Sequence, residues 1–201
     1  MVCRDWGEGG GAVNRDMGEA ARDGGAARIL VAYASRTGST AGVAEAIGRT
    51  LGESGAQVDV QPMADVKDLA PYAAVVAGSA IRGKCWLPEA MGFVQTHREA
   101  LGQRPFAAFL VCMTMAIAEG KYREAVLDFM QPVRALVRPV GEGLFAGTLD
   151  ISKVPSLRDR LMFRVSVLMG VWKSGDHRDW EAVRAWAESI RPLLLPDPQR
   201  E

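Results

Sequence analysis

Short, largely apolar runs that alternate with segments of helical spacing constrain this chain more than any other feature. Three such runs are 28–34 (RILVAYA), 73–78 (AAVVAG) and 106–113 (FAAFLVCM). Strands of a parallel sheet are continuous apolar runs of this kind because helices bury both of their faces. Two further strands are predicted at 57–61 (QVDVQ), whose strict alternation places it nearer the sheet edge, and within the glycine-punctuated segment 140–149.

Helices are predicted between and after these strands. Apolar side chains recur at helical spacing in 40–51, 87–101, 121–136 and 180–194, as they do in helices that bury one face. Pro132 must end or kink the third helix, and Asp179 is the predicted N-cap of the fourth. Strands that alternate with helices form βαβ units, so we predict an α/β domain with a parallel sheet covered on both faces.

The domain is expected to occupy residues 27–195, between tails at 1–26 and 196–201. The first tail is rich in glycine and charge and cannot bury enough apolar surface to offset the entropy of ordering; Met17 could be the true start. With 24 Lys and Arg against 24 Asp and Glu, the basic excess of a nucleic-acid binder is missing. The sequence has no cluster of cysteines and histidines that would indicate a metal site. No apolar signal segment is evident, so we expect a cytoplasmic protein.

The loop after the first strand, SRTGST, is predicted to bind phosphate. It leads into a helix, whose N-terminus presents unpaired N–H groups and a partial positive charge to an anion. Glycine in the loop lets the backbone approach closely, and four hydroxyls can donate. The loop has neither the Gly-Lys-Ser/Thr ending of a P-loop nor the Gly-x-Gly-x-x-Gly pattern of a dinucleotide-binding turn. Alternatively, the loop only caps the helix. The candidate residues are Ser35, Arg36, Thr37, Gly38, Ser39 and Thr40.

The pattern Ser-x-Thr-Gly-x-Thr after the first strand resembles the FMN phosphate loop of the flavodoxin superfamily. Three further features are similar to its menaquinone-dependent protoporphyrinogen dehydrogenases: the Arg in that loop, the stretch GSAIRGK at 78–84, and DRLMF at 159–163 followed by Gly175-Asp176 and Asp179-Trp180-Glu181. The resemblance covers about residues 28–194. It implies a flavodoxin-like, doubly wound five-stranded sheet of order 2-1-3-4-5, with FMN bound beyond the carboxyl ends of the strands.

The same resemblance assigns the loops after the third and fourth strands to the flavin ring. Gly83 is the candidate for the peptide beside the flavin N5. Trp86 would stack on the ring or is a core or interface aromatic. Arg82 or Lys84 would stabilise reduced flavin, unless Arg82 is a solvated loop charge. The remaining predicted contacts of the first of these loops are Ser79, Ala80 and Ile81. Cys112, Met113 and Thr114 are predicted from their position after the fourth strand, without a motif, and Cys112 is alternatively a small buried apolar side chain.

An insertion is expected at 151–176, between the fifth strand and the last helix. Its segment 157–172 has an apolar stripe edged with arginines. One interpretation is a peripheral contact with the membrane or an access route for a quinone. The other is a helix buried against its own domain or against a partner in a homodimer.

The function implied by the resemblance is that of an FMN-dependent oxidoreductase in heme biosynthesis. It would pass electrons from a small-molecule redox substrate through FMN to a quinone or a redox protein, and needs no catalytic side chain or metal because the flavin carries the chemistry. A second hypothesis is an electron-transfer flavodoxin. The formal charge of zero of this chain argues against it, because electron-carrier flavodoxins tend to be strongly acidic. A cofactor-free interaction module is the third.

Overall fold

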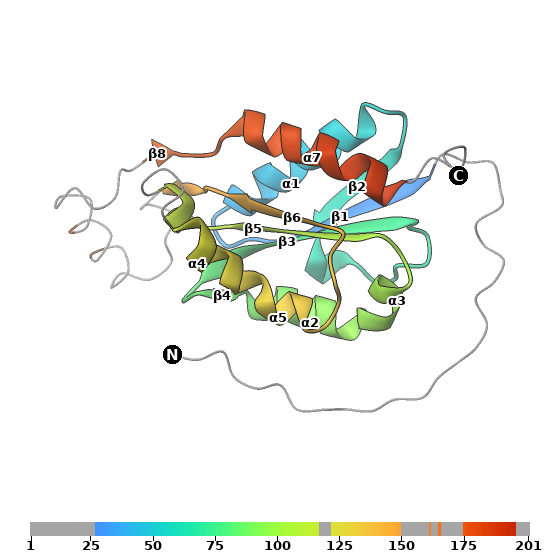
Figure 1. The fold of residues 1–201 in the computed structure, drawn as a ribbon, viewed down its shortest axis with the longest axis horizontal. Helices are drawn as coiled ribbons and strands as arrows, with labels where there is room; N and C mark the ends of the chain where they lie inside the picture. Colours follow the sequence, from blue (N-terminus) through green and yellow to red (C-terminus); the bar gives the residue numbers. More distant parts are fainter. Residues whose placement is uncertain (1–26, 117–121, 150–160, 162–164, 166–174, 196–201) are drawn as a thin grey trace.

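A parallel sheet forms the centre of the fold (Figure 1). The computed structural model describes residues 27–116, 122–149, 161, 165 and 175–195. Its parallel strands lie in the order β2-β1-β3-β5-β6, which confirms the predicted order 2-1-3-4-5. Their bounds are Arg28–Ala34 for β1, Gln57–Pro62 for β2, Ala74–Arg82 for β3, Phe106–Val111 for β5 and Gly141–Phe145 for β6.

Helices cover both faces of the sheet (Figure 1). On one face α1, Ser39–Gly52, lies beside α7, Trp180–Leu194. On the other face are α2, Pro88–Thr96; α3, Arg98–Gly102; α4, Arg123–Leu127; and α5, Gln131–Arg134. The described residues also form three 3-10 turns: η1, Met63–Asp65; η2, Met113–Ala116; and η3, Asp128–Met130.

Two of the predicted helices are divided into shorter pieces. The segment 87–101 breaks at His97, which has φ −100° and ψ 13°. The segment 121–136 becomes α4, η3 and α5, and Pro132 lies in the first turn of α5. A proline is tolerated there because the N–H that it lacks would have had no partner within the helix.

The core consists of two clusters, one on each face of the sheet. Alternate residues of a strand point to opposite faces, so Ile29 and Val31 of β1 pack beneath α1 and α7 while Leu30 and Ala32 pack on the α2 side. A Cβ on Gly78, which pairs with Phe109 on β5, would lie 2.0 Å from the Phe109 ring. The sheet therefore packs tightly around a glycine at its centre.

A small antiparallel ribbon stands beside the main sheet. It consists of β7, Thr148–Leu149, and β8, Gly175–Asp176, with Thr148 paired to Asp176. The predicted tails 1–26 and 196–201, and the predicted insertion apart from Leu161, Val165 and the residues of β8, lie outside the described residues. Among the described helices, none is both long and apolar enough to cross a bilayer.

Candidate functional site

The loop after β1 and the first turn of α1 form a cradle at the carboxyl end of the sheet. Gly38 precedes the helix in a left-handed conformation, with φ 84°, and its N–H donates to Ser35 Oγ at 3.1 Å. The first helical hydrogen bond joins Gly42 N to Gly38 O. The N–H groups of residues 39–41 consequently have no partner within α1, and the first turn holds no acidic residue. Such a turn is suited to bind an anion.

The four hydroxyls of the cradle are not equivalent. Those of Ser35 and Ser39 already accept hydrogen bonds, from Gly38 N at 3.1 Å and from Thr148 N at 2.9 Å. Thr37 is half-buried. Thr40 is fully buried, and its Oγ1 has no hydrogen-bond partner among the described residues. A buried polar atom without a hydrogen-bond partner lowers the stability of the fold. A phosphate oxygen bound at this helix terminus would be a suitable partner for the Thr40 hydroxyl.

Arg36 reaches away from the cradle toward α2. Its guanidinium donates to Glu89 Oε2 at 2.9 Å, and about half of the side chain is exposed. An exposed pair of this kind contributes only about 0–1 kcal/mol. Arg36 thus links the first loop to the start of α2, and its positive charge is balanced by Glu89.

The loop predicted after the third strand is a β-hairpin, which corrects the sequence interpretation of 78–86. β3 continues to Arg82 and pairs with β4, Cys85–Trp86. The turn residues Gly83 and Lys84 have φ values of 59° and 66°. Positive φ at both central positions is the geometry of a type I′ turn, one of the two turns that favour two-residue hairpins. The hairpin presents Arg82, Gly83 and Lys84 at an exposed tip, with Ala80 and Ile81 half-buried.

Two predicted contacts in this hairpin lie in the interior. Ser79 is fully buried; its hydroxyl donates to Ala80 O at 2.8 Å and accepts from Leu87 N at 3.0 Å. Trp86 is only 3% exposed and packs in the core cluster on the α2 side. Its indole N–H has no partner among the described residues. This burial favours the core interpretation of Trp86 over stacking on a ligand.

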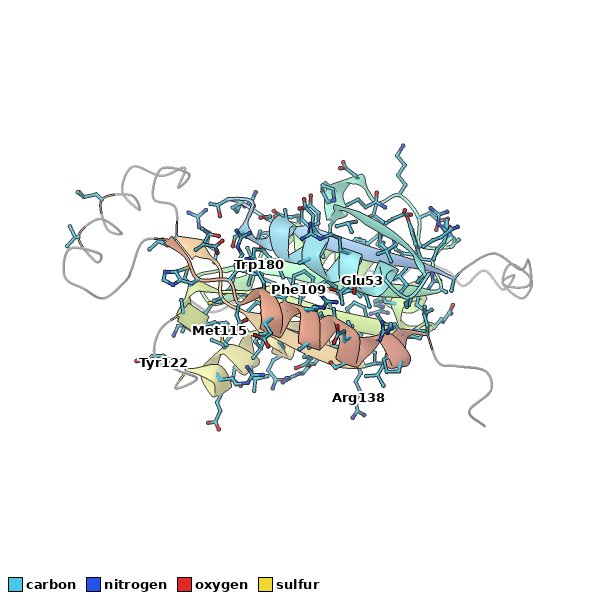
Figure 2. The ribbon with its side chains drawn as sticks, turned by 90° about the horizontal axis from the view of Figure 1, so that it is seen from above. Glu53, Phe109, Met115, Tyr122, Arg138 and Trp180 are labelled. Atoms are coloured by element: carbon cyan, nitrogen blue, oxygen red, sulfur yellow. The ribbon has the colours of Figure 1, made fainter. Side chains whose placement is uncertain are left out.

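The segment after β5 ends at the same edge of the sheet. Cys112 is buried, and its N–H donates to Phe145 O at 2.9 Å. Met113 and Thr114 begin η2 and are half-buried. Figure 2 shows Met115, Tyr122 and Trp180 toward this end of the molecule, and Glu53 and Arg138 toward the other. Because β1, β3 and β5 are parallel, the three predicted loops that follow these strands lie at one edge of the sheet.

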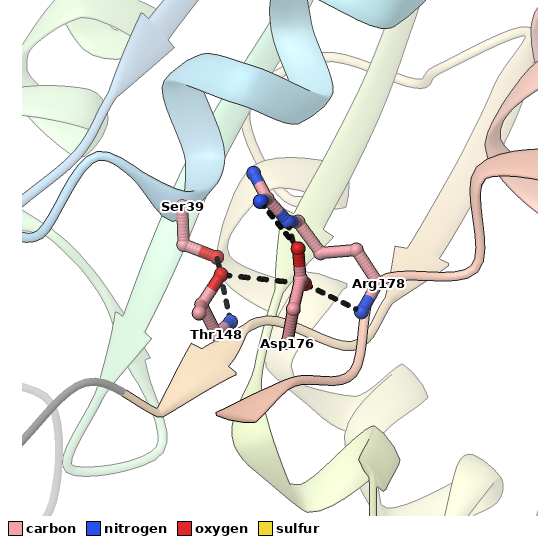
Figure 3. Close-up of polar contacts among 4 residues, drawn as sticks. All are labelled: Ser39, Thr148, Asp176 and Arg178. Atoms are coloured by element: carbon pink, nitrogen blue, oxygen red, sulfur yellow. Dashed lines mark hydrogen bonds and ion pairs between the residues drawn. The ribbon is translucent and has the colours of Figure 1, made fainter. Parts of the chain in front are cut away.

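A polar network joins the β7–β8 ribbon to the cradle (Figure 3). Ser39 Oγ accepts from Thr148 N, and Thr148 Oγ1 lies 3.5 Å from Asp176 Oδ1. Arg178 donates to Asp176 through its main-chain N at 3.1 Å and its side-chain Nε and Nη2 at 2.8 and 2.6 Å. These hydrogen bonds lower the pKa of Asp176 to about 2. Sequence reasoning did not assign Thr148, Asp176 or Arg178 to the site, because no local pattern pairs residues so far apart.

Comparisons with known proteins give the family and the fold of the chain. A family model described as a flavodoxin domain matches residues 30–176. A flavodoxin from Streptococcus pneumoniae TIGR4 is 17% identical, with 82% of this chain and 97% of that chain covered and a TM-score of 0.53. A short-chain flavodoxin associated with a PDU bacterial microcompartment is 14% identical, with coverage of 82% and 96% and a TM-score of 0.51. No curated protein matches the sequence.

Proposed function

Because the chain belongs to the flavodoxin domain family, we propose that it is a redox protein that binds FMN in the cradle of residues 35–40. The observation that carries this proposal is the orphaned hydroxyl of Thr40, buried in the first turn of a helix that is suited to an anion. FMN is the cofactor expected of the family, and its phosphate is an anion of the right kind. Bound FMN supplies the transfer of one or two electrons.

The cradle residues have separate tasks in this proposal. The N–H groups at the start of α1 and the hydroxyls of Thr37 and Thr40 donate to the phosphate. Gly38 provides the left-handed turn that exposes these N–H groups, and Ser35 fixes that turn through its hydrogen bond to Gly38 N. The phosphate is thus held chiefly by neutral donors and the helix terminus, since the charge of Arg36 is directed to Glu89.

The ring of FMN would lie against the hairpin tip and η2. Main-chain groups of Ala80 to Gly83 and of Cys112 to Thr114 are proposed to contact the ring, and the exposed cations Arg82 and Lys84 would favour its reduced, anionic form by Coulomb attraction. Ser79 and Trp86 are proposed to support the hairpin rather than to contact the ring, because the Ser79 hydroxyl is already bonded to Ala80 O and Leu87 N and the Trp86 ring packs in the core cluster on the α2 side.

We further propose the protoporphyrinogen dehydrogenase type of reaction, with a small-molecule donor and a quinone acceptor. The support is the sequence resemblance at Arg36 and 78–84, together with a formal charge of zero, which is unlike that of the acidic electron carriers. Contact of 157–172 with a membrane, and a homodimer, belong to the same proposal. That segment lies mostly outside the described residues.

The test begins with the visible absorption spectrum of the purified protein reconstituted with FMN. Bound-flavin bands are expected, and Thr37→Leu should abolish them by placing an apolar side chain at the phosphate. Thr96→Leu, at an exposed position near the end of α2, is the matched control and should retain FMN. A wild-type protein that stays colourless would overturn the proposal.

The reaction type is tested on the FMN-loaded protein with protoporphyrinogen as donor and menadione as acceptor. Porphyrin fluorescence should rise faster than in the autoxidation control without protein. A rate equal to autoxidation, from protein that holds FMN, would reject this reaction and leave electron transfer to a redox protein as the function.

A further inference from the structure

We propose that the Asp176–Arg178 ion pair is a positioning unit that holds the first turn of α1 in the conformation that binds FMN phosphate. The inference rests on the proposed function and assigns a role to residues outside the predicted loops. Two separate contacts connect the pair to α1, one through Thr148 and Ser39 and one at Gly42.

The first contact runs through the β7–β8 ribbon. Asp176 is the cross-strand partner of Thr148, and the two side chains approach to 3.5 Å between Oδ1 and Oγ1. The N–H of Thr148 then donates to Ser39 Oγ at 2.9 Å, and the Thr148 hydroxyl lies 3.4 Å from the same oxygen. Ser39 is the first residue of α1. The ribbon therefore holds the residue at which α1 begins.

The second contact lies one turn further along α1. A Cβ placed on Gly42 would lie 2.5 Å from Arg178 Nη1, so the guanidinium occupies the space that a side chain would fill. Arg178 is fixed in place by its two side-chain hydrogen bonds to Asp176 and by the Trp180 ring, whose centroid is 4.4 Å from Cζ. Figure 3 shows the guanidinium reaching over Asp176.

These contacts assign Ser39 and Arg178 to positioning rather than to phosphate binding. The oxygen of Ser39 accepts from Thr148 N, and its O–H can donate to Thr148 Oγ1 at 3.4 Å; the charge of Arg178 is balanced by Asp176. Preorganised donors bind more tightly because little order has to be imposed when the ligand arrives. The ion pair thus raises FMN affinity by holding the N–H groups of α1 in place.

The experiment compares two alanine substitutions in one helix. Gly42→Ala displaces the end of the Arg178 side chain, whereas a Cβ on Gly52 meets only Val58 Cγ2 at 3.9 Å. Both changes favour helix formation, so neither should destabilise the fold. We expect FMN, titrated by quenching of its fluorescence, to bind about fivefold more weakly to Gly42→Ala and unchanged to Gly52→Ala. The ³¹P resonance of bound FMN should move only in Gly42→Ala.

A second comparison tests the path through the ribbon. Asp176→Asn and Ser39→Ala should each weaken FMN binding. The fold-loss of FMN affinity in the double variant should be smaller than the product of the two single fold-losses, because both residues act through one network. Independent losses would mean that Ser39 binds phosphate directly, and would overturn the positioning role. Equal affinity of Gly42→Ala and wild type would overturn it as well. Wild-type protein that does not bind FMN would refute the proposed function and this inference together.

Discussion

Replacing Thr40 with valine should change stability and cofactor affinity in opposite directions. Valine keeps the shape of threonine and removes the Oγ1 that is buried without a partner among the described residues. Relief of the unmet hydrogen bond should stabilise the cofactor-free protein by about 1 kcal/mol, or roughly 2–4 °C in Tm for a chain of this size. Loss of a bond to charged phosphate, worth about 1.5–3 kcal/mol, should weaken FMN binding about 10- to 100-fold.

Thr50→Val in the same helix is the matched control. Thr50 is also buried, but its Oγ1 donates to Ala46 O at 3.1 Å. This substitution removes a bond that is made, so it should lower stability by about 0.5–1.5 kcal/mol and leave FMN affinity unchanged. Thermal melts of the cofactor-free proteins and fluorescence titrations with FMN measure both quantities. If Thr40→Val binds FMN as tightly as wild type, the assignment of Thr40 to the phosphate is refuted.

Three further substitutions test the backbone, the core and the ion pair. Gly38→Ala should lower the free energy of unfolding by about 1–2 kcal/mol, because a residue with a Cβ is strained at φ 84°. No atom lies within 4 Å of the added Cβ, so backbone strain is the only cause, and an unchanged urea midpoint would contradict it. Gly78→Ala should cost about 1–3 kcal/mol by overpacking, and Phe109→Leu in the same chain should recover part of it; a neutral Gly78→Ala would refute the packing. Asp176→Asn should be less stable than wild type above pH 3.8, and the gap should shrink as pH falls toward 2, since Arg178 lowers the pKa of Asp176 to about 2. A gap independent of pH from 5 to 2 would exclude that contribution.

The sheet and the glycine-containing turn that leads into α1 could be predicted because their signals are local. Runs such as 28–34 and 106–113 are apolar at nearly every position, as required of strands buried on both faces. The loop at 35–40 combines a glycine with hydroxyls directly before a helix. Both features depend on neighbours in the chain, so the sequence displays them without reference to distant residues.

Other parts of the site depend on pairing that no short segment reveals. The hairpin at 81–86 has Gly-Lys as its turn, rather than the Asn-Gly pair that signals such turns. Thr148 meets Asp176 across a ribbon whose strands are far apart in sequence. Trp180 has the helical spacing of the apolar side chains of α7, but it is 43% exposed and contacts Arg178. In each case a tertiary contact determines the outcome.

The placement of α7 beside α1 has a consequence for the order of folding. The cluster beneath these helices joins Val43 and Ile47 to Val183 and Ile190, which come from opposite ends of the described chain, so its contacts close a very long loop. The cluster on the other face is built largely from segments that follow one another. Contacts between distant segments form slowly, so we expect the α7 face to close last. It is then also the face at which the native domain opens first, and hydrogen exchange of the α7 amides should be faster than exchange of those in β3 and β5.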